Sequence, residues 1–85
     1  MSLENYRKEL DIIDNQIIEL LVKRFKVIDK VSEHKKKNNI EIIQKERMKE
    51  IYRKVEALAI ESNLDPKFTH ELFELIMNEA IRREK

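Results

Sequence analysis

The sequence predicts an all-α fold of three helices, one of them very long. The 85 residues include no glycine and one proline, and 41% of them are charged, a composition that favours long helices over a turn-rich β fold. Hydrophobic residues make up another 41% and recur at helical spacings, so a disordered chain is not expected. We therefore predict a single helical domain over residues 1–85.

The first predicted helix begins near Ser2, a good N-cap residue, and nothing in the sequence ends it before Asn38 and Asn39. A helix of about 34 residues is roughly 50 Å long, far longer than a globule of this size is wide. Because one short chain cannot cover so long an apolar stripe, we predict an intertwined helical homodimer. The stripe comprises Leu3, Tyr6, Leu10, Ile13, Ile17, Leu20, Leu21, Ile28 and Val31.

Two shorter helices are predicted to follow. The second runs from about residue 42 to residue 62, with Asn63 as its C-terminal cap. Asp65 and Pro66 mark the start of the third, as N-cap and first helical residue. The inner stripe of the second helix is Met48, Ile51, Val55, Leu58 and Ser62, with Tyr52 and Ala59 alongside. The apolar face of the third is Phe68, Leu72, Phe73, Leu75, Ile76 and Ala80.

Charge balance and residue content limit the classes of function. The net charge is +1, so the whole chain does not attract nucleic acid. The chain has no cysteine and no His/Asp/Glu grouping with zinc-like spacing, so we expect neither metal nor cofactor. No apolar run approaches the roughly 20 residues of a membrane span, and no signal peptide is visible. We expect a cytoplasmic protein without nucleic-acid or membrane partners.

The most informative stretch lies inside the first helix, between Arg24 and Lys35. Ile28, Val31 and Lys35 all fall within about 40° of Arg24 on the helix surface. This stripe is apolar in its middle and cationic at its two ends, which are roughly 16 Å apart. Both side chains could lean inward and hold one small anion. The alternative is that both cations extend to water from the rim of an apolar stripe.

Two further charged residues interrupt apolar faces. Arg47 lies on the inner stripe of the second helix, and Glu84 extends the apolar row of the third. Taken alone, Arg47 suits a rim position and Glu84 a frayed C-terminal turn. Together with Arg24 and Lys35, they indicate a cationic pocket that contains one carboxyl group and lies between the helices.

Arg7 does not fit a pocket built from one chain. It precedes Arg24 by 17 residues, which places it about 100° round the helix from the Arg24 stripe. In an antiparallel dimer it could reach the pocket of the partner chain. The alternative is a solvent-facing arginine paired with Asp11 on the next turn.

Several short segments occur in a fixed order along the chain, namely Arg7 with Leu10-Asp11-Ile12-Ile13-Asp14, Leu20-Leu21-Val22-Lys23-Arg24, Val31 and Lys35, Glu46-Arg47, Leu64-Asp65, and Phe73-Glu74-Leu75-Ile76. In order and spacing, they resemble the all-helical, AroQ-type chorismate mutases over nearly the whole chain. The resemblance implies a dimer of three-helix chains that converts chorismate to prephenate by a Claisen rearrangement, in phenylalanine and tyrosine biosynthesis.

The resemblance also implies roles for the charged residues. Arg24 and the partner's Arg7 would hold the two substrate carboxylates, and Lys35 would contact the ether oxygen and a carboxylate. Arg47 would line the pocket and support substrate binding. Glu84 stands where the family carries Gln or Glu, as the second group facing the ether oxygen. Because only a protonated carboxyl group can donate a hydrogen bond there, we expect activity to rise as pH falls.

Three positions in the expected substrate pocket depart from the family pattern. Many members carry Asp at the position of Gln44 and Glu at that of Met48, where the Glu binds the substrate hydroxyl. Ala80 replaces a serine that often helps to hold a carboxylate. The lost contacts should weaken chorismate binding by about 1 kcal/mol for each hydrogen bond.

Two other functions stay open. The apolar residue after Glu46-Arg47 resembles the isochorismate-pyruvate lyases, which share the fold and eliminate pyruvate from isochorismate. A non-catalytic module that serves dimerisation or regulation of an aromatic-pathway enzyme is the third interpretation. The four cations Arg7, Arg24, Lys35 and Arg47 argue against that module, because an idle pocket has no need to keep them.

Overall fold

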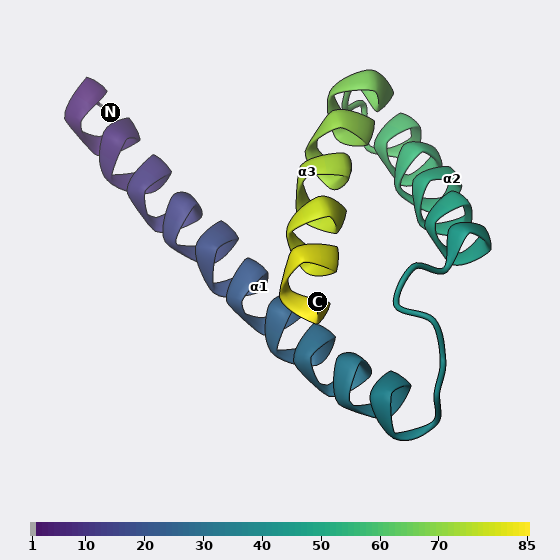
Figure 1. Ribbon diagram of the computed structural model, residues 1–85. Coiled ribbons are helices and arrows are strands. Elements are labelled where there is room, and N and C mark those ends of the chain that lie inside the picture. The colour runs from purple at the N-terminus through teal and green to yellow at the C-terminus, as the bar shows by residue number, and fades with distance from the viewer. Residues whose placement is uncertain (1) are drawn as a thin grey trace.

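The computed structural model describes residues 2–85 and confirms the all-helical prediction. Met1, the first residue of the predicted domain, lies outside the described residues. Figure 1 shows the chain turning back after its long first helix, so that the two shorter helices form an antiparallel pair. The helices are α1 (Leu3–Lys37), α2 (Lys45–Glu61) and α3 (Pro66–Glu84).

Short-range hydrogen bonds define both ends of α1. Ser2 Oγ accepts a hydrogen bond from the Asn5 N–H at 3.2 Å, as predicted for an N-cap. At the other end Asn39 has a φ of 54°, and the N–H of Ile40 donates to the Lys35 carbonyl oxygen at 2.9 Å. This is the hydrogen bond of a Schellman closure, here made with Asn instead of the commoner Gly. The connecting loop therefore leaves α1 in a fixed direction.

The prediction for the start of α2 was wrong. The helix begins at Lys45 rather than at about residue 42, and residues 38–44 form one loop. The carbonyl oxygen of Ile42 accepts a hydrogen bond from Lys35 Nζ at 2.7 Å. In a helix that carbonyl would accept from the N–H four residues later, whereas here it faces Lys35 from a segment that is not yet helical.

The turn between α2 and α3 follows its sequence signals. Asn63 has a φ of 57°, and the N–H of Leu64 donates to the Ala59 carbonyl oxygen at 2.8 Å, which confirms the predicted cap. A carboxylate oxygen of Asp65 accepts a hydrogen bond from the Lys67 N–H at 2.9 Å, which confirms the predicted start of α3.

The core of this single chain is thin and lies where α3 packs on α2 and α1. Its buried hydrophobic residues are Ala59, Met77 and Ala80. The predicted apolar faces are only partly correct, because the buried line of α3 runs through Thr69, Met77, Ala80 and Glu84. Four members of the predicted faces stay between 40% and 70% exposed, namely Leu58, Phe68, Leu72 and Leu75.

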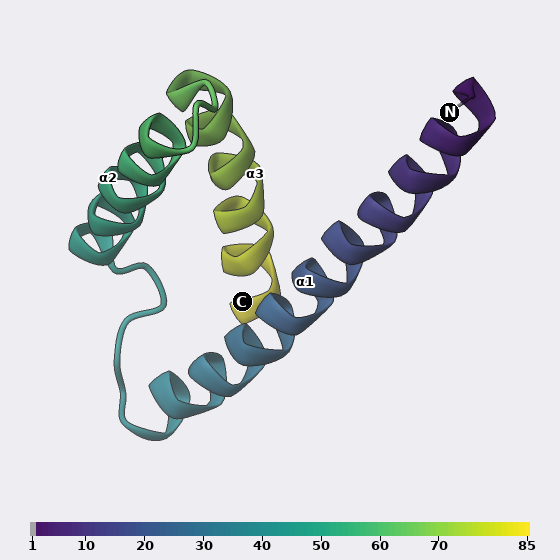
Figure 2. The ribbon, with the colours of Figure 1, turned by 180° about the vertical axis from the view of Figure 1, so that it is seen from behind.

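The N-terminal half of α1 extends away from α2 and α3, as Figure 1 and Figure 2 show from opposite sides. The radius of gyration is 16.1 Å, against about 12 Å for a compact chain of this length. Six apolar side chains of this half are between 47% and 64% exposed, so the predicted stripe is uncovered in one chain. They are Leu3, Tyr6, Leu10, Ile13, Ile17 and Leu20.

Within residues 2–85 no helix is both long and apolar enough to cross a membrane. The cytoplasmic location and the single-domain boundary stay predictions.

Candidate active site

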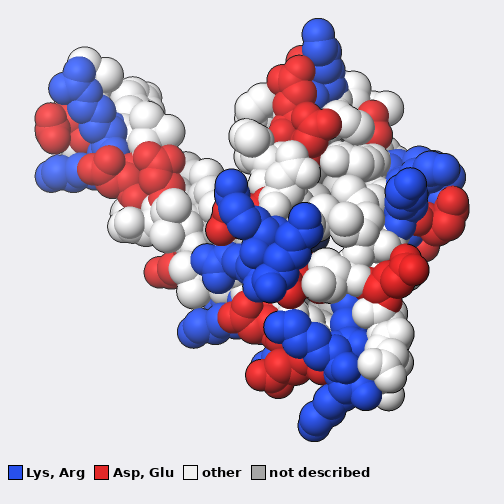
Figure 3. All heavy atoms as spheres, viewed as in Figure 1, with Lys and Arg blue, Asp and Glu red and all other residues white. Residues whose placement is uncertain are grey.

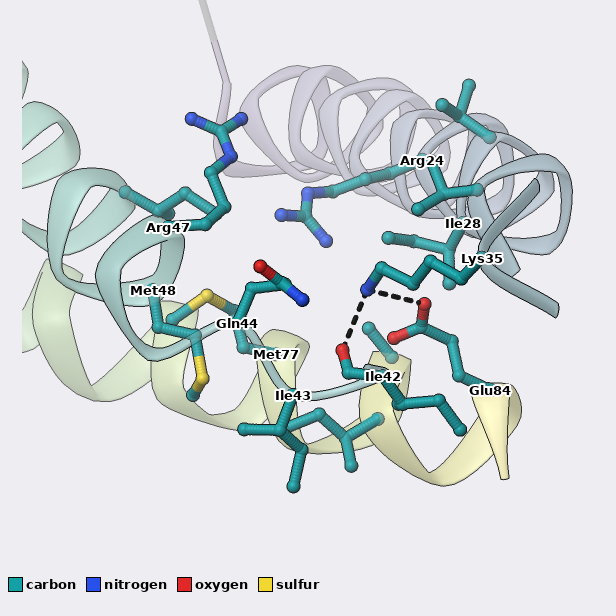
Figure 4. A pocket seen from close by; sticks show the side chains of 15 residues that line it. Arg24, Ile28, Lys35, Ile42, Ile43, Gln44, Arg47, Met48, Met77 and Glu84 are labelled. Atoms are coloured by element: carbon teal, nitrogen blue, oxygen red, sulfur yellow. Dashed lines mark hydrogen bonds and ion pairs between the residues drawn. The ribbon is translucent and has the colours of Figure 1, made fainter. Parts of the chain in front are cut away.

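A pocket of about 420 Å³ lies between the C-terminal half of α1, the loop 38–44, the start of α2 and the end of α3. Figure 4 shows side chains from all four segments directed toward this space. Every residue predicted for the site except Arg7 lines it. Its polar side chains are Arg24, Lys35, Gln44, Arg47 and Glu84.

Lys35 and Glu84 form an ion pair in the pocket wall. The Lys35 Nζ lies 3.0 Å from Glu84 Oε1, and their side chains are only 14% and 5% exposed. The same Nζ donates to the Ile42 carbonyl oxygen at 2.7 Å (Figure 4). Lys35 is in the last turn of α1, and Glu84 follows Ala80 by one turn on the buried line of α3. The pocket thus holds a fixed positive charge with a carboxylate beside it.

Arg24 lies about three turns before Lys35 on the same face of α1. Its Nη1 is buried and finds no hydrogen-bond partner among residues 2–85. Burial, and then the nearby charge of Arg47, lower the pKa of the Arg24 guanidinium. A bound carboxylate would satisfy this nitrogen and relieve the repulsion between the two arginines.

Arg47 comes from the first turn of α2, on the other side of the pocket from α1 (Figure 4). Its Nη1 lies 2.5 Å from Glu50 Oε1, and the two side chains are 59% and 61% exposed. An exposed pair of this kind is weak, so the guanidinium is free to exchange Glu50 for a ligand.

Arg7 is not brought to the pocket of its own chain. Its side chain is exposed on the N-terminal half of α1, about 25 Å along the helix from Arg24. The role that the resemblance gives to Arg7, across a dimer interface, stays a prediction.

The three departures from the family pattern all lie at the pocket. Met48 and Ala80 present apolar groups to it, beside other apolar residues such as Ile51 and Met77. The Gln44 side-chain Nε2 donates to the Glu41 carbonyl oxygen at 2.8 Å, so this amide holds the loop. Ligand hydroxyl groups that face Met48 or Ala80 would find no partner in those side chains.

One polar contact of the site was missed by the sequence analysis. The carbonyl of Ile42 orients Lys35, but a main-chain carbonyl can belong to any residue type, so no motif reveals it. The pair Asn38-Asn39 directly after Lys35 was the available signal, because Asn tolerates the left-handed backbone that returns the chain toward the helix.

Charges elsewhere on the molecule are mixed. Figure 3 shows acidic and basic atoms interspersed over one face, with basic atoms gathered near the C-terminal end of α3, where Arg82 and Arg83 form the last turn. One of these, Arg83, stacks over the Phe25 ring with its guanidinium carbon 4.5 Å from the ring centroid. The buried positive charges of the described residues are therefore concentrated in the pocket.

Comparison with known proteins identifies the family to which this chain is related. The family described as chorismate mutase type II matches residues 6–85. The chain belongs to the type II chorismate mutase family. This confirms the resemblance seen in the sequence.

Named relatives of this chorismate mutase family member are of two kinds. A chorismate mutase of Methanocaldococcus jannaschii is 32% identical over 85 residues, which cover 98% of this chain and 86% of that protein. Two bifunctional chorismate mutase/prephenate dehydratases of Buchnera aphidicola, from the subspecies Schizaphis graminum and Acyrthosiphon pisum, are 36% and 33% identical over 99% of this chain. The chain spans 22% of the length of each bifunctional protein.

Proposed function

We propose that this chain catalyses the rearrangement of chorismate to prephenate. The observation that carries the proposal is the Nη1 of Arg24, which is buried and has no partner in the described part of the chain, in the same pocket as the fixed ammonium of Lys35. The volume of about 420 Å³ suits a small molecule. The family and the archaeal relative named chorismate mutase support the same reaction.

The reaction needs placement and charge more than reactive groups. Within one chorismate molecule a carbon–carbon bond forms while the ether carbon–oxygen bond breaks, and no atom enters or leaves. The protein has to hold the dicarboxylate in a compact conformation and stabilise negative charge that develops on the ether oxygen. Arginines suit the carboxylates because they bind them through two parallel hydrogen bonds.

In this proposal each charged side chain of the pocket has a defined task. Arg24 binds one carboxylate, and Arg47 leaves Glu50 to support substrate binding. Lys35 directs positive charge at the ether oxygen, and Glu84 in its protonated form donates a second hydrogen bond there.

We also propose that the active form is a homodimer in which each Arg7 enters the partner's pocket. The uncovered apolar half of α1 and the large radius of gyration support this assembly, since a second copy would cover the stripe. In this dimer, Arg7 of one chain would be the cation that binds the second substrate carboxylate in the pocket of the other chain.

Purified protein tests the function directly. Loss of chorismate absorbance is followed, products are separated by chromatography, and isochorismate is run in parallel. Lys35→Ala should abolish turnover, whereas the neighbouring, exposed Lys36→Ala should retain it. Prephenate from the wild type supports the mutase. Pyruvate from isochorismate with little prephenate would favour the lyase, and no reaction with either substrate would favour the non-catalytic module.

A further inference from the structure

The loop between α1 and α2 is attached to Lys35 twice. The main-chain carbonyl of Lys35 accepts from the Ile40 N–H at 2.9 Å, and its ammonium donates to the Ile42 carbonyl oxygen at 2.7 Å. Asn39, which precedes these two isoleucines, has a φ of 54° and turns the chain back. The backbone of Asn39 therefore sets the direction in which the chain leaves α1 toward Ile42.

The two acceptors around the ammonium leave one direction open. A lysine ammonium has three N–H donors. In this pocket one faces Glu84 Oε1 at 3.0 Å and one faces the Ile42 carbonyl oxygen (Figure 4). With both acceptors in place, the third N–H has a fixed direction. With Glu84 alone, the flexible four-carbon stem could place the ammonium in several ways.

We propose that Asn39 is a positioning residue for the reaction in this pocket. Its left-handed backbone holds the Ile42 carbonyl against Lys35 and so directs the third N–H of the ammonium toward the bound substrate. The consequence for catalysis rests on the proposed function, whereas the link between Asn39, Ile42 and Lys35 does not. Asn39 itself is exposed and does not line the pocket.

The chain provides a matched control in Asn63. It has a φ of 57°, is exposed, and ends α2 with the same hydrogen bond, from the Leu64 N–H to the Ala59 carbonyl oxygen. The pocket residues of α2 end at Ile51 and those of α3 begin at Met77, so the turn at Asn63 lies away from the pocket (Figure 1). A substitution that acts only by weakening a helix end should have the same effect on kcat at Asn39 and at Asn63.

The kinetic test compares Asn39→Val, Asn63→Val and Asn39→Gly. Valine disfavours a positive φ, and glycine adopts it readily. At a temperature where circular dichroism shows all variants folded, Asn39→Val should lower kcat by tenfold or more, since misplacement by about 1 Å can cost a factor of about a hundred. Its KM should change less than kcat, because Arg24, which binds a carboxylate in the proposed function, stays in place on α1. Asn63→Val and Asn39→Gly should retain kcat.

An unchanged kcat in Asn39→Val, or an equal loss in Asn63→Val, would overturn the proposal. If Asn39→Val does not fold, Asn39→Ala replaces it with the same expected direction, because alanine also disfavours a positive φ but less strongly.

A second measurement is independent of catalysis. On isotope-labelled protein without ligand, NMR should detect a scalar coupling across the hydrogen bond between Lys35 Nζ and the carbonyl carbon of Ile42. The coupling should persist in Asn63→Val and vanish in Asn39→Val. Its absence from the wild type would overturn the inference even in an active mutase. Its presence in a protein that does not convert chorismate would refute the proposed function and leave the positioning link standing.

Discussion

Lys35 Nζ lies 3.0 Å from Glu84 Oε1, so an ion pair joins the last turn of α1 to the last residue of α3. The two residues are 49 positions apart in the sequence. The pair lies in the wall of the pocket and also helps to hold α3 against α1. Changes at either residue should therefore affect stability as well as activity.

The first prediction concerns stability. Lys35→Met should lower the free energy of unfolding by about 3 kcal/mol, the low end for a broken buried pair because the Lys35 side chain is 14% exposed, since it leaves the Glu84 carboxylate buried without its cation. Adding Glu84→Gln should restore part of this loss, since the amide removes the unpaired charge. Urea denaturation at one protein concentration measures both effects, with the exposed Lys36→Met as control. Equal losses in Lys35→Met and Lys36→Met would show that the buried pair contributes nothing.

The second prediction concerns pH. An ionised Glu84 neutralises Lys35 and repels negative charge on the ether oxygen, whereas the protonated acid donates a hydrogen bond. The charged groups that share the pocket with Glu84 are Lys35, Arg24 and Arg47. We expect kcat/KM for chorismate to rise as pH falls, because only the protonated acid can donate this hydrogen bond. Glu84→Gln should give a flat profile, and an unchanged slope in that variant would show that the pH dependence arises elsewhere.

The third prediction separates stability from activity at Arg24. Within residues 2–85 its Nη1 is buried without a hydrogen-bond partner, next to the charge of Arg47. Arg24→Met should therefore leave stability unchanged or raise it by about 1 kcal/mol, while turnover falls by about a hundredfold or more. Thermal unfolding and chorismate assays on the same sample measure both. A strongly destabilised Arg24→Met would mean that the guanidinium supports the fold.

The fourth prediction concerns the start of α2. Gln44 is its N-cap but makes no side-chain capping hydrogen bond. Gln44→Asp should stabilise the protein by about 0.5–1 kcal/mol, because aspartate can accept from the free N–H groups of the first turn. Gln44→Ser tests the cap without adding charge and should give part of the gain. No gain in either variant would indicate that the hydrogen bond from Gln44 to Glu41 is worth as much as the cap.

The fifth prediction tests the proposed dimer. Arg7→Ala and Lys35→Ala should each be inactive alone. After mixed refolding in equal amounts, half of the dimers contain both chains, and one of their two pockets has every residue if Arg7 crosses the interface. We expect recovery of about a quarter of wild-type activity. No recovery would place Arg7 outside the partner's pocket, and a monomer by analytical ultracentrifugation would refute the assembly.

Several helix ends and the cationic face of α1 were predictable from local rules, whereas Gln44, Met48 and Ala80 were placed at the pocket only by the family resemblance. Ser2, Asn63 and Asp65 cap helices by hydrogen bonds within a few residues, and helical periodicity alone places Arg24 and Lys35 on one face. The later start of α2 was not predicted, and the segment before it makes a tertiary contact to Lys35 that local patterns do not contain.

The exposed apolar residues show the other limit of the sequence analysis. Helical periodicity identifies the apolar face of a helix. It does not tell which edge of that face a neighbouring helix covers. On α3 the buried line includes Thr69 and Glu84, whereas Leu72 and Leu75 stay 40% and 70% exposed. That choice is made by packing between helices, which local patterns do not contain.

The left-handed turns at Asn39 and Asn63 have a consequence for the unfolded chain. Glycine fits such turns with the least strain, but it also has the largest conformational freedom to lose on folding. A sequence with no glycine has a more restricted unfolded ensemble, so the entropy opposing folding is smaller. For a chain with so thin a core, part of the stability of the helical state comes from how little freedom its denatured state has.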